Sequence, residues 1–96
     1  MIPPAIFKFR LYTADDAPNS ADAIANLNAF CETYLPGRYE IEIVDVYKEP
    51  KRALAEGVSM TPMLIKLAPA PVCRIVGTLS RPQPLLLAFG LNTLVA

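Results

Sequence analysis

Two cysteines and a pair of adjacent aspartates are the side chains of this sequence that could do chemistry. Cys31 and Cys73 could exchange disulfides, but they lie far apart and form neither a C-x-x-C motif nor a zinc-binding spacing. The sequence contains no histidine, so the commonest general base and the commonest metal ligand are missing. Because unpaired cysteines are among the most buried residue types, we predict two buried thiols, no bound metal and no cofactor.

The adjacent aspartates, Asp15 and Asp16, could serve as catalytic carboxylates. Neighbouring side chains point in different directions, however, and the pattern offers no base, metal partner or apolar pocket that would adapt either acid to catalysis. We interpret them as a solvated loop before a helix, where negative charge suits the helix dipole. Asp45 lies inside a strand pattern and is interpreted as a hydrogen-bonded structural residue. The sequence therefore predicts no catalytic residue and a protein that is not an enzyme.

The composition is that of one folded domain spanning residues 1–96, with 53% hydrophobic and 19% charged residues. Nine basic and nine acidic side chains cancel, and no segment concentrates lysine and arginine, so a nucleic-acid partner is not expected. No apolar run approaches the roughly 20 residues that cross a bilayer, and the N-terminus lacks the pattern of a secretory signal. We therefore expect a cytoplasmic protein with no membrane contact.

The first half of the chain predicts a strand, a crossover helix and a second strand. Residues 5–13 alternate apolar and basic side chains, as a half-buried strand does. A helix should begin at a cap provided by Asn19 or Ser20 and run to about Leu35, before Pro36 and Gly37. Residues 39–46 then alternate glutamate with isoleucine. This order gives a right-handed parallel βαβ unit, with the basic side chains of one strand facing the glutamates of the other.

The second half predicts a short helix, a hairpin and a closing helix. Pro50 and Gly57 bracket a helix over residues 50–56, and strands follow over residues 62–67 and 72–76. The link between these strands is too short for a parallel crossover, so they must pair antiparallel. The leucine-rich residues 85–95 close the chain as a helix. The order βαβαββα with a mixed four-stranded sheet is the thioredoxin-like topology.

The start of the first helix is where a thioredoxin-like protein carries its redox dithiol. Here that segment reads Asp-Asp-Ala-Pro-Asn-Ser over residues 15–20, with no thiol, so disulfide exchange at this place is excluded. Pro62 follows Thr61 at the position of the cis-proline of thioredoxin folds, and we predict that it shapes the sheet there as a structural cis-proline.

The order and spacing of several segments resemble the KaiB family of bacterial clock proteins over most of the chain. These segments are Leu11-Tyr12-Thr13-Ala14, Pro18-Asn19-Ser20, Val44-Asp45-Val46, Thr61-Pro62, the proline-punctuated residues 66–71, and Arg74-Ile75-Val76-Gly77-Thr78-Leu79-Ser80. The resemblance implies a metamorphic protein that exchanges a thioredoxin-like monomer with a resting fold, βαββααβ, that is usually tetrameric. It also implies docking on a KaiC-like ring ATPase, with KaiA-like or SasA-like proteins as further partners.

The residues of the C-terminal region favour the thioredoxin-like arrangement over the resting fold, which needs a strand there. Residues 85–91 contain no β-branched side chain, and Pro82 and Pro84 suit the approach to a first helical turn. The closing helix is apolar nearly all round. Either it is tucked wholly into the core, or surplus apolar surface marks a protein contact or self-association.

The leading hypothesis is therefore a non-catalytic regulatory protein that binds a KaiC-like ring ATPase. An edge strand beside a basic short helix offers a pairing template and steering charges. The predicted partner-binding residues are Glu40, Glu42, Lys48, Lys51 and Arg52. Two alternatives remain open: a SasA-like input module for a kinase, and a thiol oxidoreductase that uses Cys31 or Cys73.

Overall fold

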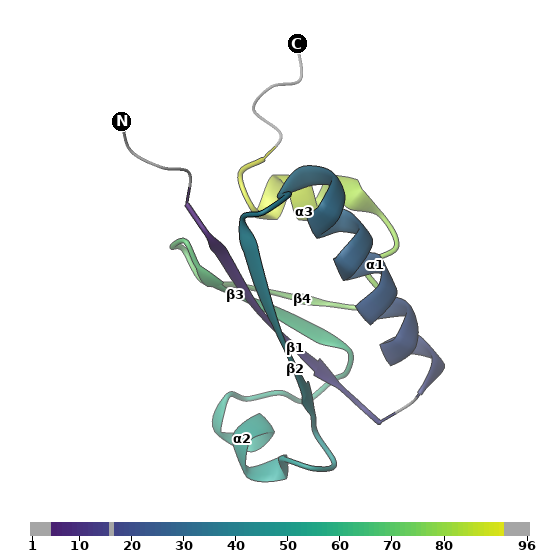
Figure 1. The fold of residues 1–96 in the computed structure, drawn as a ribbon. Helices are drawn as coiled ribbons and strands as arrows, with labels where there is room; N and C mark the ends of the chain where they lie inside the picture. Colours follow the sequence, from purple (N-terminus) through teal and green to yellow (C-terminus); the bar gives the residue numbers. More distant parts are fainter. Residues whose placement is uncertain (1–4, 16, 92–96) are drawn as a thin grey trace.

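The order of elements agrees with the thioredoxin-like prediction in the computed structural model, which describes residues 5–15 and 17–91 (Figure 1). The elements are β1 (Phe7–Thr13), α1 (Pro18–Tyr34), β2 (Tyr39–Asp45), α2 (Pro50–Ala55), β3 (Met63–Ala68), β4 (Cys73–Val76) and α3 (Pro82–Ala88). In the described part of the chain, no helix is long and apolar enough to cross a membrane.

The four strands form one mixed sheet in the order β2-β1-β3-β4. Strands β1 and β2 run parallel, and β3 runs antiparallel to both β1 and β4. The register places Lys8 beside Glu40 and Arg10 beside Glu42, as the charge pattern predicts. Of these two pairs, Arg10 and Glu42 form an ion pair, with 2.8 Å between Nε and Oε1.

The main core lies between the sheet and helices α1 and α3. Alternate residues of β1, namely Phe7, Phe9 and Leu11, enter it, because successive side chains of a strand point to opposite faces. The Phe9 ring packs on Phe89, which follows α3, with 5.2 Å between ring centroids. Leu27 of α1 is fully buried in the same core. These contacts fix α1 and α3 on one side of the sheet (Figure 1).

A smaller core lies on the other face of the sheet, where the short helix α2 covers one end. It is formed by Tyr12, Val44, Ala53, Met63 and Ile65. With six residues, α2 covers only part of this face, and Lys8 and Arg74 beyond it are exposed. The helices therefore cover the two faces of the sheet to unequal extents.

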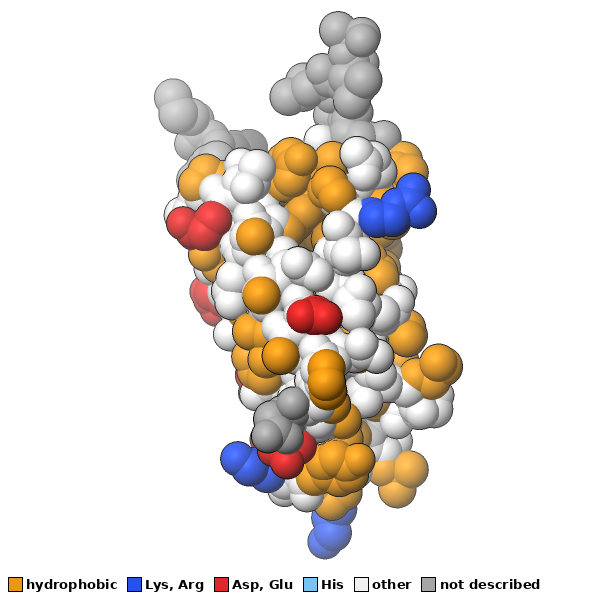
Figure 2. Space-filling view, turned by 90° about the vertical axis from the view of Figure 1, so that its right-hand side faces the viewer, with side chains coloured by type: hydrophobic (Ala, Val, Ile, Leu, Met, Phe, Trp, Pro, Cys, Tyr) orange, Lys and Arg blue, Asp and Glu red, His pale blue; other side chains and the backbone are white. Residues whose placement is uncertain are grey.

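The surface around α1 is poor in charge. Among the 17 residues of this helix, Asp22 and Glu32 are the charged ones. Figure 2, which views the side of the molecule that α1 occupies, shows few red or blue side chains, and hydrophobic side chains gather in its upper part. A charged interaction surface is therefore expected on another side of the molecule.

The start of α1 differs from the prediction that Asn19 or Ser20 caps it. The helix begins at Pro18, and Ala17 stands at the N-cap without a side-chain hydrogen bond. Proline needs no hydrogen-bond acceptor in the first helical turn, which allows the earlier start. Ser20 is buried, and its Oγ accepts the N–H of Ala14 at 2.9 Å. The serine therefore ties the preceding loop to the helix.

The closing helix also has different bounds from the predicted residues 85–95. It begins at Pro82, because both prolines fit its first turn, and it ends at Ala88, followed by Phe89 and by Gly90 with φ +69°. Residues 92–95 of the predicted helix lie outside the described residues. Leu85 is buried whereas Leu87 is 66% exposed, so surplus apolar surface remains on this helix. The predicted ends of the other elements differ by one or two residues.

We expect the isolated chain in solution to keep α3 helical. Each helix preference of Leu85, Leu86 and Leu87 is worth about 1 kcal/mol or less, but a two-state fold is decided by a few kcal/mol. NMR should therefore give helical ¹³Cα shifts for residues 82–88 and the rotational correlation time of a small particle. Strand shifts over these residues, or a tetramer as the dominant species, would contradict this expectation.

Candidate interaction surface

The start of α1 is closed by structural hydrogen bonds and holds no reactive group among the described residues. Asp45 Oδ1 accepts the N–H of Tyr47 at 2.8 Å and the N–H of Asp15 at 3.3 Å. Asp45 is therefore the hydrogen-bonded structural residue that its place in the sequence predicts. Asp15 is exposed with φ +52°, and Asp16 lies outside the described residues.

The two thiols lie in different environments, which corrects the prediction that both are buried. Cys31 of α1 is fully buried, and this burial, with a smaller effect of the Glu32 charge, raises its pKa to about 12. Cys73 is half-buried, because it lies at the first position of the edge strand β4. Neither thiol lies at the start of α1.

The Thr61–Pro62 peptide bond is cis, and Pro62 is buried where β3 begins. Its carbonyl oxygen accepts the N–H of Gly77 at 3.0 Å, which joins it to the end of β4. The bonds before Pro69 and Pro71, in the β3–β4 loop, are also cis. Pro62 therefore lies in the part of the sheet where the sequence predicts a structural role for it.

An ionic network fastens α2 to the sheet. Arg10 of β1 bridges Glu42 of β2 and Glu56, which follows α2, with 2.8 Å from Nε to Glu42 Oε1 and 2.8 Å from Nη1 to Glu56 Oε1. The hydroxyl of the fully buried Tyr12 also donates to Glu56. On the outer side, Arg52 of α2 contacts Glu42 at 2.7 Å. The network thus joins α2 to both parallel strands.

The protonation equilibria of the two glutamates reflect this network. Burial by itself would raise the pKa of Glu56, but hydrogen bonds from Tyr12 and Arg10 together with the Arg10 charge outweigh it and lower that pKa. The hydrogen bonds from Arg52, and then from Arg10, lower the pKa of Glu42. Both side chains are therefore charged in the folded protein near neutral pH.

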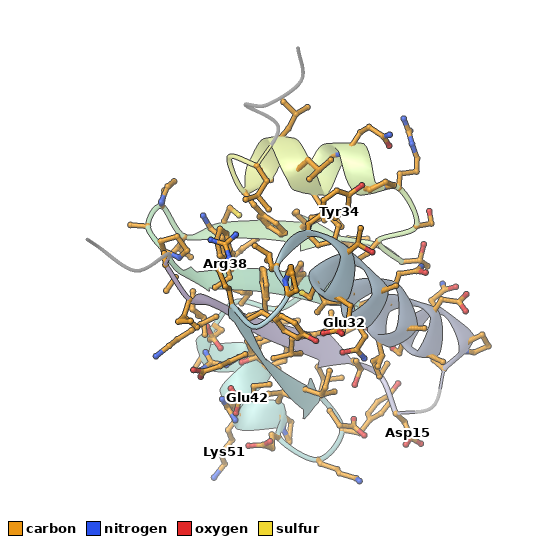
Figure 3. All side chains as sticks on the ribbon, turned by 45° about the horizontal axis from the view of Figure 1, so that its top comes forward. Asp15, Glu32, Tyr34, Arg38, Glu42 and Lys51 are labelled. Atoms are coloured by element: carbon orange, nitrogen blue, oxygen red, sulfur yellow. The ribbon has the colours of Figure 1, made fainter. Side chains whose placement is uncertain are left out.

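The structure brings Glu42, Lys48, Lys51 and Arg52 to the α2 end of the molecule, whereas Glu40 lies near the other end of β2. Glu42 and Arg52 pair with each other, so their charges are largely compensated. Lys48 and Lys51 are exposed and line a shallow cavity of about 390 Å³ at the start of α2, and Glu40 is exposed farther along β2. Figure 3 shows Glu42 and Lys51 close to α2. The lysines supply the accessible positive charge.

The sequence analysis did not identify two large apolar side chains of this surface. Leu54 of α2 is 81% exposed, and Tyr47, in the loop between β2 and α2, is 73% exposed. The exposure of Leu54 could have been predicted from the sequence, because a short helix that buries Ala53 must direct the next side chain outward. We define the α2 surface as Tyr47, Lys48, Lys51 and Leu54, together with the adjacent edge strand β2.

The fold and this site define a class: thioredoxin-like α/β domains without a thiol at the start of the first helix. Chloroplastic thioredoxin z superposes with a TM-score of 0.73 at 15% identity, over 88% of this chain and 76% of that one. The N-terminal domain of SasA from Synechococcus elongatus gives 0.66 at 17% identity, over 98% and 84%. These likenesses show the shared fold.

The family follows from the sequence comparisons. The KaiB domain model matches residues 10–90. "Circadian clock protein KaiB3" of Synechocystis sp. is 39% identical over 82 residues, which are 85% of this chain and 80% of that protein. "Circadian clock oscillator protein KaiB" of Synechococcus sp. strain RCC307 is 36% identical over 91 residues, 95% and 83% of the two chains. This chain belongs to the KaiB family, as the segments quoted above indicate.

We expect Glu56→Gln to lower the free energy of unfolding at neutral pH by about 1 kcal/mol, because a charge-assisted acceptor for Tyr12 and Arg10 is lost. Since the folded-state pKa of Glu56 lies below the ordinary value of 4.5, its contribution is complete above that value and disappears as pH falls through the folded pKa. Urea unfolding from pH 7 to about pH 3 measures the difference between the two proteins.

The matched control is Glu40→Gln on β2, an exposed glutamate with no ion pair among the described residues. This substitution should change stability little at any pH. A stability difference between wild type and Glu56→Gln that stays constant into acid would show that the carboxylate charge is not what fastens α2.

Proposed function

We propose that this chain is a cytoplasmic, non-catalytic regulatory protein of the circadian-clock type that binds a KaiC-like ring ATPase through the α2 surface. Membership of a family whose relatives are named as circadian clock proteins supports the regulatory role. The exposed Leu54 and Tyr47, flanked by Lys48 and Lys51 beside an edge strand, support the location of the contact. The exposure of Leu54 is the observation that carries this assignment.

The α2 surface combines the features of a protein contact. An exposed leucine and tyrosine can enter pockets of a partner and contribute most of the binding free energy. The two lysines steer encounter with an acidic rim and raise the association rate more than the final affinity. The ion pairs beneath α2 hold this short helix in place before binding, which reduces the entropy lost on association. The partner face that fits is therefore apolar at its centre and acidic at its margin.

A SasA-like input module is a second candidate function, supported by the fold shared with the SasA N-terminal domain. SasA-like or KaiA-like proteins would then compete for the same ATPase or bind this chain. Binding titrations discriminate the two functions. The chain is titrated with a KaiC-like ATPase and with a SasA-like kinase, first with each alone and then with both together. Displacement of the kinase supports the leading proposal, and binding to the kinase alone supports the second.

We expect Leu54→Asp to weaken binding to the ATPase by about 2 kcal/mol, or roughly thirtyfold in Kd. Leu54 contributes little to the fold, so the variant should unfold like wild type. Leu87→Asp is a matched control, because Leu87 is an exposed leucine on α3, at the opposite end of the molecule (Figure 1). Calorimetric titration of both variants measures the effect. Equal losses in the two variants would place the contact elsewhere.

The paired substitution Lys48→Glu and Lys51→Glu should slow association about tenfold at low ionic strength, with less effect in high salt. Arg52 is left intact, because its removal would also release Glu42 and loosen α2. Arg81→Glu, a charge reversal before α3, is the control. Stopped-flow measurement of the association rate tests the expectation, and an unchanged rate at low salt would exclude these lysines.

Replacing both thiols, as Cys31→Ala and Cys73→Ser, should leave ATPase binding nearly unchanged, apart from stability lost in the core. The reason is the burial of Cys31 and the absence of either thiol from the start of α1. Binding titration and an insulin-reduction assay measure the two functions separately. If wild type reduces insulin and the folded variant does not, the chain is a thiol oxidoreductase instead.

A further inference from the structure

Lys66 of β3 is a buried cation without an acidic partner among the described residues. Its side chain is 2% exposed and lies on the main-core face of the sheet, with 5.9 Å between its Nζ and the centroid of the Phe7 ring. The ion pairs of the described residues join Arg10 and Arg52 to glutamates and do not include Lys66. A buried ammonium is costly unless it is paired, and one aromatic face offsets only part of that cost. The amine of Lys66 is therefore a group of the main core whose charge the described fold leaves uncompensated.

Cys73 lies directly opposite Lys66 across the antiparallel pair of β3 and β4. Directly opposed side chains of such a pair project to the same face, with their Cβ atoms about 4.5–5.5 Å apart. Cys73 packs against the main core, as this placement requires. The lysine stem is long and flexible, so rotation about its side-chain bonds can move the amine from the Phe7 ring to the sulfur of Cys73. A nitrogen nucleophile and a thiol therefore lie within reach of each other.

The two thiols of the chain differ in their access to solvent. Cys73 is half-buried at the first position of the edge strand β4, so a small oxidant can reach its sulfur. Cys31 is fully buried in α1, and burial raises its pKa to about 12, so it stays a protonated thiol near neutral pH. Oxidation should therefore select Cys73, and Cys31 serves as an internal control.

We propose that Cys73 and Lys66 form a covalent sulfur–nitrogen crosslink, a sulfenamide, when the protein meets hydrogen peroxide. In the first step the sulfur of Cys73 attacks peroxide: an S–O bond forms, the O–O bond breaks, and the released hydroxide takes up the thiol proton as water. In the second step the neutral amine of Lys66, whose extra proton has passed to solvent, attacks the sulfenic acid. The S–N bond forms, the S–O bond breaks, and hydroxide leaves with an amine proton as a second water. The sulfur has then lost two electrons to peroxide.

The surroundings of Cys73 favour capture by Lys66 over the other fates of a sulfenic acid. The amine is held on the neighbouring strand, which gives it a high effective concentration compared with any thiol in solution. The crosslink also removes a positive charge from the core, and with it the cost of burying the ammonium. Glutathione reverses the step: one thiol forms a mixed disulfide with Cys73 and returns the amine, and a second releases the Cys73 thiol and leaves as oxidised glutathione. The site is therefore a reversible sensor of peroxide.

The proposed crosslink is independent of the proposed ATPase contact. Lys66 and Cys73 lie on the main-core face of the sheet, whereas α2 packs on the other face. β4 and β2 are also opposite edges of the sheet, so the crosslink should leave the α2 surface accessible. The crosslink is measured on the chain alone, without an ATPase, so the two proposals fail separately.

Mass spectrometry of the dilute full chain, treated with excess hydrogen peroxide, tests the crosslink. The product should lack two hydrogen atoms, and trypsin should no longer cleave after Lys66, so residues 53–74 should appear as one peptide in place of 53–66 and 67–74. Dithiothreitol should restore both shorter peptides. Oxidised methionine gains oxygen and does not block this cleavage, so it is read separately. Cleavage after Lys66 in a chain whose Cys73 has become a sulfinic acid or an interchain disulfide overturns the proposal, as does a Cys73 thiol that peroxide leaves intact.

Two variants identify the atoms of the crosslink. Lys66→Arg keeps the cation, but its guanidinium stays protonated and is no nucleophile, so the crosslinked product should fall at least about tenfold and sulfenic or sulfinic acid should replace it. Cys31→Ala should crosslink as wild type does, and circular dichroism confirms the fold of both variants. A loss of two hydrogens that persists in Lys66→Arg would assign the nitrogen to the backbone and overturn the role of Lys66. If Lys66→Arg does not fold, the wild-type digest decides the question by itself.

Discussion

The α2 surface depends on the hydrogen bonds that the carboxylate of Glu56 accepts. A helix of six residues is too short to be stable alone, so α2 exists because the sheet holds it. Ala53 supplies apolar contact, and Glu56 supplies a directed bond by accepting from the buried Tyr12 hydroxyl and from Arg10. Removing that acceptor would leave a buried hydroxyl without a partner, which costs more than the bond itself contributes. The position of Leu54 and Lys51 thus follows from a contact on the opposite side of the helix.

Strand β1 transmits this constraint to the rest of the domain. It is paired on both sides, parallel to β2 and antiparallel to β3, and contributes to both cores. Phe7, Phe9 and Leu11 fix α1 and α3 on one face, whereas Arg10 and Tyr12 on the other face fix α2. A change of register by one residue would exchange these two sets and destroy both layers. The alternation of β1 therefore determines where each helix lies.

Local signals explain what the sequence could predict. The period of two in β1 and β2 and the proline–glycine stop after α1 depend on neighbouring residues, so elements and topology followed from pattern. The ion pairs of Arg10 join residues more than thirty positions apart, and no local rule reveals that Glu56 is an acceptor. The sequence predicts Asn19 or Ser20 as the cap of α1, but the helix begins at Pro18, and the Ser20 hydroxyl bonds to the loop before it. The two prolines of α3 had the same effect on its beginning.

The start of α1, where thioredoxins carry their thiols, is held together by structural hydrogen bonds in this chain. Reactivity at a helix start requires unsatisfied donors and an accessible nucleophile. Here Asp45 accepts the N–H of Asp15 and of Tyr47, and Ser20 accepts that of Ala14. The neighbouring Pro62 is buried, and its carbonyl bonds to Gly77. These backbone donors are thus satisfied within the structure. Strands β2 and β4 form the two edges of the sheet, and large exposed apolar side chains lie on α2, on α3 and in the loops. The proposed protein contact at the α2 surface uses the interactions that remain available beside one of these edges.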